Sequence, residues 1–231
     1  RFYLADRYLY SDGSYGPRSQ NSTKTPIAVI VSDHLAIALH DINEGGAEQL
    51  QWGSNTTSSE VLSWYNACMN YADLFNVNQY GQAHNATGAA RSAVSGYTPA
   101  APSGHVWTFP TLVDFLKMGI TLGRMTENSF GDYLSYWGGG EYTFFAPSGA
   151  AATGFSPAPS TANFPAMDMT RFSRAFTNVG GTPPSGTYWT YMECKDGTEY
   201  KMATIEISGG KFHLGLKSKT ETAKVRPVIT Y

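Results

Sequence analysis

Strand-forming stretches stand at both ends of this 231-residue chain, and helix-forming stretches lie between them. Because strands and helices do not alternate along the sequence, a parallel sheet built from βαβ units is not expected. Apolar and polar residues alternate in the last stretches, which is typical of antiparallel strands with one buried face. The order therefore predicts an α+β fold with antiparallel sheets. Strands are predicted over 8–10, 27–32, 35–39, 188–194, 200–207, 211–216 and 225–231. The strands over 27–32 and 35–39 are predicted to form a hairpin about Asp33-His34, and Ser208-Gly209-Gly210 is a predicted turn.

Two helices are predicted in the first half of the chain. Thr57 and Glu60 form a capping-box pattern, and apolar residues follow at helical spacing over 61–75. Thr111 and Asp114 make a similar start for a short second helix. We expect these two helices to pack against the strands.

Two other stretches contain no long regular element. The stretch 76–103 is polar with Gly, Ala and Pro, and 126–186 mixes aromatic residues with Gly, Pro, Ala and Ser, with short helices predicted near 130–136 and 169–176. A length of 231 residues is more than most single domains need and less than two domains of typical size need. We therefore predict a single domain over 1–231, with insertions at about 76–103 and 126–186.

The composition favours an extracellular protein. Only 15% of residues are charged, against roughly 25% in an average soluble chain, so Ser, Thr, Asn, Gly and Tyr are expected to cover the surface. The net charge of −2 gives no basic footprint for nucleic acid, and the longest apolar run is too short to cross a membrane. The chain starts at Arg1 without a signal-like stretch, as expected of a mature chain or of a fragment cut from a precursor.

Cys68 and Cys194 are the two cysteines of the chain. They form no C-x-x-C pattern and no Cys/His cluster, so no structural zinc site is expected. One long-range disulfide between them would stabilise the fold by a few kcal/mol. Two buried free thiols are the alternative, because free cysteine is commonly buried.

Four motifs, taken in series, resemble one known family. They are Asp6-x-Tyr8-x-Tyr10-Ser11-Asp12-Gly13, Trp107-Thr108-Phe109-Pro110-Thr111-x-x-Asp114, Tyr188-Trp189-Thr190-x-x-Glu193 and Val225-Arg226-Pro227-Val228. The series resembles the C-type-lectin-like domain of bacterial surface and pilus-tip proteins, a family that includes variable proteins of diversity-generating retroelements. The resemblance implies that the terminal strands pair, that two helices flank the sheet and that a long loop region carries ligand specificity.

The same resemblance implies a role at the outer surface of a bacterium, on a pilus or on a phage fibre. Its partners would be a glycan or protein on another cell and other pilus subunits. The calcium-binding tripeptides of sugar-binding vertebrate lectins are absent from the sequence, as are the paired cysteines of the related formylglycine-generating enzymes. No metal or cofactor is therefore expected.

No enzyme signature stands out. Ser32-Asp33-His34 are adjacent, and adjacent residues on a turn do not face one another as a catalytic triad must. The five histidines show no metal-ligand spacing. Carboxylate pairs such as Glu44 with Glu48, or Glu193 with Asp196, would suit glycoside hydrolysis if they converged in space, and are otherwise solvated surface residues. We expect a protein that is not an enzyme.

The candidate ligand contacts lie on the last strands and in the aromatic loop. Alternation predicts a solvent-exposed face on the strands, and Tyr and Trp supply contact area at low entropic cost. An ordinary solvated face is the alternative for the strands, and a satellite core that seals the loops is the alternative for the aromatics. The strand candidates are Tyr191, Glu193, Tyr200, Met202, Thr204 and His213, and the loop candidates are Trp137, Tyr142 and Phe144.

These observations predict a non-enzymatic, surface-displayed domain that binds a ligand, as an adhesin or receptor-binding module. The alternatives are a structural pilus subunit without its own ligand and a glycan-processing enzyme. Polymerising pilins usually need a donated strand or an open edge.

Overall fold

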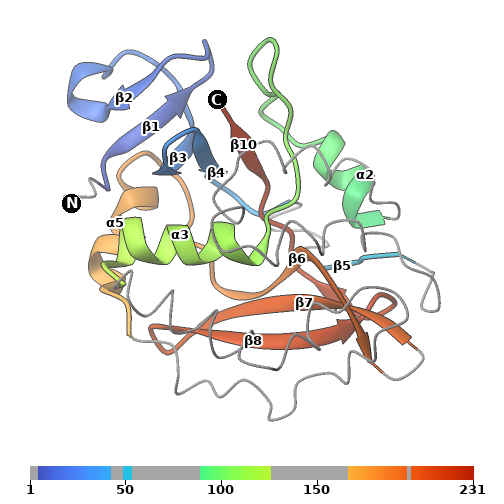
Figure 1. Cartoon of the computed structure of the whole chain (residues 1–231). Helices are drawn as coiled ribbons and strands as arrows, with labels where there is room; N and C mark the ends of the chain where they lie inside the picture. Colours follow the sequence, from blue (N-terminus) through green and yellow to red (C-terminus); the bar gives the residue numbers. More distant parts are fainter. Residues whose placement is uncertain (1–4, 43–48, 54–88, 126–165, 197–198) are drawn as a thin grey trace.

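The computed structural model describes residues 5–42, 49–53, 89–125, 166–196 and 199–231 (Figure 1). In these residues the protein is α+β, with antiparallel sheets and few helices, as predicted. The strands are β1 (Arg7–Tyr10), β2 (Tyr15–Pro17), β3 (Pro26–Ser32), β4 (Leu35–Ala38), β5 (Leu50–Gln51), β6 (Gly186–Asp196), β7 (Glu199–Ser208), β8 (Lys211–Ser218), β9 (Thr222–Ala223) and β10 (Val228–Thr230). The helices are η1 (Arg18–Gln20), α2 (Ala89–Ser95), α3 (Leu112–Gly123) and α5 (Met169–Thr177).

The first sheet joins strands from opposite ends of the sequence. Its order is β10-β4-β3-β1-β2, and every neighbouring pair is antiparallel. The predicted hairpin of β3 and β4 is confirmed, with its turn at Asp33 and His34. The predicted strand over 225–231 shortens to β10, because Arg226 turns into the core and Pro227 has no N–H to donate.

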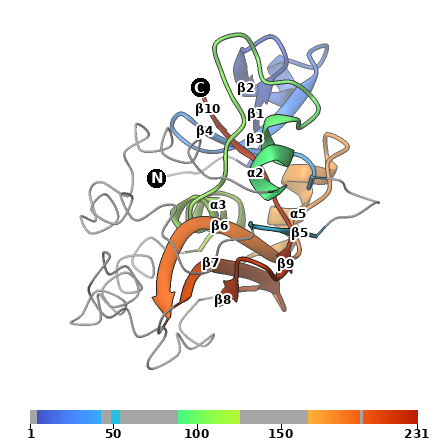
Figure 2. The same ribbon diagram turned by 90° about the vertical axis from the view of Figure 1, so that its right-hand side faces the viewer.

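The second sheet is formed by the long strands β6, β7 and β8, beside the two-stranded pair of β5 and β9 (Figure 2). Strands β7 and β8 pair without interruption from Lys201 with Ser218 to Ser208 with Lys211, which includes every residue of β8. Gly209 and Gly210 join them with φ of 59° and 74°, a left-handed turn that favours glycine. The predicted turn at this position is confirmed.

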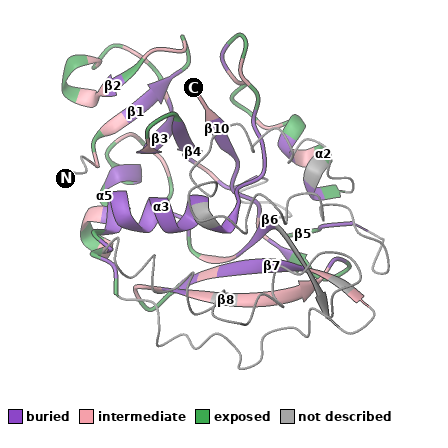
Figure 3. Ribbon diagram, viewed as in Figure 1, coloured by how far each residue is buried: buried purple, intermediate pink, exposed green. Residues whose placement is uncertain are grey.

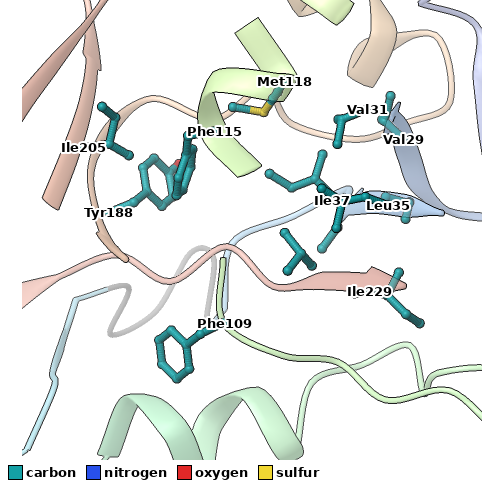
Figure 4. Close-up of a cluster of buried hydrophobic side chains, with 14 of the residues drawn as sticks. Val29, Val31, Leu35, Ile37, Phe109, Phe115, Met118, Tyr188, Ile205 and Ile229 are labelled. Carbon is teal, nitrogen blue, oxygen red and sulfur yellow. The ribbon is translucent and has the colours of Figure 1, made fainter. Parts of the chain in front are cut away.

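Helix α3 lies between the two sheets and is buried along its length (Figures 1 and 3). Thr111 caps it: its hydroxyl accepts from the Asp114 N–H at 3.3 Å, and the Asp114 carboxylate accepts from the Thr111 N–H at 2.8 Å. Phe115 packs on Tyr188 of β6 at a centroid distance of 5.6 Å, and Met118 lies in the same buried cluster (Figure 4). The predicted second helix is confirmed, and it contributes to both halves of the core.

The first of the two predicted insertions contains a helix that its composition did not suggest. Within the predicted irregular stretch 76–103 the structure describes α2, which corrects that prediction. Alanines favour the helix, and Ala90 and Val94 anchor it in the core. The predicted short helix over 169–176 is confirmed as α5, whose N-cap is Asp168.

Two predicted helices, over 61–75 and near 130–136, lie outside the described residues. A search of the described residues finds no helix long and apolar enough to cross a membrane.

Candidate functional site

Three side chains line up across the second sheet near the β7–β8 turn. Glu206 of β7 pairs with Thr187 of β6 on one side and with His213 of β8 on the other. Residues paired across strands share a face, so these side chains stand side by side. Ser208 and Lys211 extend the row to the turn. We call these five residues the polar patch, and each of them is exposed or half-buried.

Hydrogen bonds hold the polar patch together. Glu206 accepts at one carboxylate oxygen from the Ser208 hydroxyl at 3.2 Å and at the other from the Thr187 hydroxyl at 3.5 Å. The carbonyl of Ser208 lies 3.0 Å from Nε2 of His213, which must carry the proton because a carbonyl only accepts. The patch therefore offers a carboxylate, an imidazole, two hydroxyls and an ammonium group on neighbouring strands.

Among the predicted strand contacts whose side chains the structure describes, His213 alone is not buried. The exposure predicted for Tyr191, Met202 and Thr204 is wrong, because their exposed fractions are 2%, 0% and 3%. Figure 3 shows the middle of β7 buried, whereas β8 is half-buried. Residue types alternate along β7 as expected of a strand with one exposed face. At the centre of β7, however, the residues of both faces are buried.

Tryptophans account for this cover. Trp189 pairs with Thr204 and so shares its face, and the indole N–H of Trp189 donates to the carbonyl of Leu50 at 2.7 Å. Trp52, which follows β5, packs edge-on against Trp189 at a centroid distance of 6.2 Å. The β5–β9 region thereby covers one end of the second sheet, and the polar patch at the other end stays at least partly exposed to solvent.

Tyr191 lies at an irregularity in β6 and is buried beside Trp52. The register with β7 shifts between Trp189 and Glu193, so the alternation of faces is interrupted there. The Tyr191 N–H donates to the carbonyl of Pro110 at 2.8 Å, and its ring lies 6.1 Å from that of Trp52. Tyr191 is part of the core.

The remaining candidates are not described. Only the backbone of Glu193 and Tyr200 is placed, in β6 and β7. The loop aromatics Trp137, Tyr142 and Phe144 lie outside the described residues, as does Cys68, and of Cys194 only the backbone in β6 is described. The disulfide and the two free thiols therefore both stay predictions.

A buried charge network links the residues after β4, the start of β6 and the segment before β10, and its arginine belongs to the closing Val225-Arg226-Pro227-Val228 motif. The guanidinium of Arg226 is fully buried. It donates to the carbonyls of Ala38 and Leu39 at 2.9 Å, to the carbonyl of Thr182, and to the Asp41 carboxylate at 3.0 Å. An arginine inside an otherwise apolar terminal segment was the available signal for it.

The other oxygen of the Asp41 carboxylate accepts from the Tyr188 hydroxyl at 3.1 Å, and the Lys224 ammonium lies 3.9 Å away. Burial raises the pKa of Tyr188 well above its usual range, and the negative charge of Asp41 raises it further. Every charge in this network is paired, so its role is structural.

The described residues contain no group of three His, Cys, Asp or Glu side chains that could hold a metal ion. Ser32 ends β3, and Asp33 and His34 form the turn that follows it, as predicted. Nδ1 of His34 contacts the carbonyl of Tyr231 at 2.8 Å.

Comparison with known proteins identifies no family. No protein-family model matches the chain, and no curated protein matches it. A crystal structure of a fimbrial protein from Bacteroides ovatus ATCC 8483 is similar at a TM-score of 0.40 and 14% sequence identity. The match covers 99% of this chain and 49% of the fimbrial protein, so the chain spans about half of that protein's length.

Proposed function

We propose that this protein is a non-enzymatic, surface-displayed domain that binds a glycan or protein ligand through the polar patch. The observation that carries the proposal is the strand register, which sets Thr187, Glu206 and His213 side by side at the more exposed end of the second sheet. Strands hold binding groups more precisely than loops do. The low charge content and the polar, aromatic composition support an extracellular location.

The chemistry of the polar patch favours binding over catalysis. Its single carboxylate, Glu206, already accepts hydrogen bonds from two hydroxyls, and the His213 imidazole is hydrogen-bonded to a carbonyl instead of a nucleophile. Glycoside hydrolysis needs two facing carboxyl groups. A hydroxyl-rich or amide-rich ligand could share the same donors and acceptors without any bond being broken.

The resemblance to the C-type-lectin-like family belongs to this proposal. Terminal strands that share one sheet and a helix packed on that sheet support it. Membership among retroelement-diversified proteins would appear as clustered sequence variation on β6 to β8 in sibling strains. Uniform strands in those strains would argue against it.

A structural pilus subunit is the second candidate. In the described part of the chain β8 pairs with β7 alone, and an eight-residue edge strand can accept an added strand. Such a subunit would polymerise with partner subunits and would retain no separate ligand.

The test is a binding screen against immobilised glycans and purified extracellular proteins. We expect the wild-type protein to bind, and the double variant Glu206→Gln with His213→Ala to bind at least about tenfold more weakly, because hydrogen bonds to charged groups each contribute on the order of 2 kcal/mol. Thr177→Ala, on the exposed surface of α5, is the matched control and should bind like the wild type.

All three proteins should melt at the same temperature. A wild type that binds nothing in the screen, or a double variant that binds as tightly as the wild type, would contradict the proposal.

A further inference from the structure

A second exposed surface, on the first sheet, is built from aromatic rings. Tyr15 at the start of β2 is 55% exposed, and its ring contacts that of Tyr231 at a centroid distance of 4.9 Å and an interplanar angle of 52°. The chain end that carries Tyr231 lies beside the β1–β2 hairpin (Figures 1 and 2). The His34 ring lies 6.0 Å from the Tyr231 ring. We call Tyr15, Tyr231 and His34 the aromatic platform.

Hydrogen bonds to backbone carbonyls hold Tyr231 and His34 in place. The Tyr231 N–H donates to the His34 carbonyl at 3.1 Å, and His34 Nδ1 donates back to the Tyr231 carbonyl at 2.8 Å. The Tyr231 hydroxyl reaches the carbonyl of Ser32 at 3.5 Å. Rigid aromatic rings lose little entropy when a ligand packs on them.

His34 occupies a position where glycine would be easier to accommodate. Its φ of 63° lies in the left-handed region, which a residue with a side chain adopts at a cost. Strained residues of this kind gather at functional sites. The imidazole held against Tyr231 is the feature that glycine could not supply.

Charged groups stand at the rim of the platform. Burial raises the pKa of Tyr231 to about 12, while the positive charge of Arg7 lowers it and the negative charge of Asp33 raises it. Arg7 in β1 pairs with Pro17, two residues after Tyr15, and Asp33 directly precedes His34 in the β3–β4 turn. Arg7 is half-buried and Asp33 is exposed, so an apolar surface the size of a few rings is bordered by a guanidinium and a carboxylate.

We infer that the aromatic platform binds the pyranose ring of a glycan. A pyranose has an apolar face of C–H groups, which the electron-rich faces of Tyr15 and Tyr231 attract, and a rim of hydroxyls. Neighbouring hydroxyls suit a carboxylate and a guanidinium, each of which can make two parallel hydrogen bonds, here Asp33 and Arg7.

This inference rests on the proposed function and deepens it, because it names the ligand class and a second contact surface. The two surfaces lie on different sheets and share no residue, so each can be tested without the other.

Saturation-transfer NMR with methyl pyranosides of glucose, galactose, mannose, fucose and N-acetylglucosamine tests the inference. We expect the wild type to transfer saturation to the C–H groups of at least one pyranoside. Tyr15→Ala should weaken that binding by about tenfold, and Tyr15→Phe should retain it because the ring remains. Val106→Ala, the control, removes another exposed apolar side chain and should leave binding unchanged.

His34→Gly gives a second test that unfolding cannot mimic. Glycine relaxes the backbone at this position, so the variant should fold at least as well as one with alanine there, yet bind the pyranoside more weakly than the wild type. Equal binding by Tyr15→Ala and the wild type would overturn the inference.

Comparison with the polar-patch variant separates this inference from the proposed function. If the double variant Glu206→Gln with His213→Ala lost pyranoside binding and Tyr15→Ala kept it, the inference would be overturned and the proposed function would stand. A wild type that binds a protein ligand but no pyranoside would do the same. Loss in Tyr15→Ala alone would support the inference and count against the polar patch as the pyranoside contact.

Discussion

At the scale of single residues, the guanidinium of Arg226 ties the last strand to the segment that follows β4. It satisfies the carbonyls of Ala38 and Leu39, and the Asp41 carboxylate neutralises its charge. The face of the guanidinium lies 5.1 Å from the centre of the Phe176 ring, which adds a cation–π contact with α5. A buried charge that is fully paired specifies one arrangement of these segments, because any other arrangement leaves it unpaired.

Removing Arg226 should therefore cost more than its burial alone suggests. We expect Arg226→Met to lower the free energy of unfolding by about 3 kcal/mol or more, because it leaves the Asp41 charge without its guanidinium partner. Urea denaturation of the single variants and of the double variant with Asp41→Asn would measure the coupling. If the two losses simply add, the pair contributes nothing specific.

At the scale of elements, α3 owes its start to a capping box that is cut off from water. Thr111 and Asp114 are both buried, so an N–H left without its cap has no solvent to bond. We expect Thr111→Ala to lower the free energy of unfolding by about 2 kcal/mol. Asp168→Ala, which removes the exposed N-cap of α5, should cost about half as much because water replaces the carboxylate. Chemical denaturation would contradict this view if the two variants lost stability equally.

The elements also show what local sequence could and could not predict. The cap at Thr111, the β3–β4 hairpin and the glycine turn at Gly209 are set by neighbours in sequence, and all were predicted correctly. The exposure of Thr204 was predicted wrongly. Thr204 lies beside Trp189, and Trp52, which is far away in sequence, packs on Trp189 and helps to bury this face. The aromatic platform likewise joins Tyr15 to Tyr231, and no local pattern announces that contact.

At the scale of the whole molecule, the two sheets meet on helix α3. Buried residues of both sheets and of α3 belong to one hydrophobic core. A close approach lies at Gly119, where a Cβ atom would overlap the ring of Phe212 in β8. A glycine there lets the helix and the second sheet come together, so it couples the two sheets.

This coupling predicts how the protein should unfold. Gly119→Ala should lower the free energy of unfolding by about 2 kcal/mol through overpacking against Phe212, despite the better helix propensity of alanine. If the sheets form one cooperative unit, hydrogen exchange should accelerate equally in β3 of the first sheet and β7 of the second. Gly96→Ala is the matched control, because its Cβ would meet only two carbonyl oxygens at 3.8 and 3.9 Å. Faster exchange in β7 alone would mean that the sheet bearing the polar patch unfolds separately, and ligand binding there would then stabilise only that sheet.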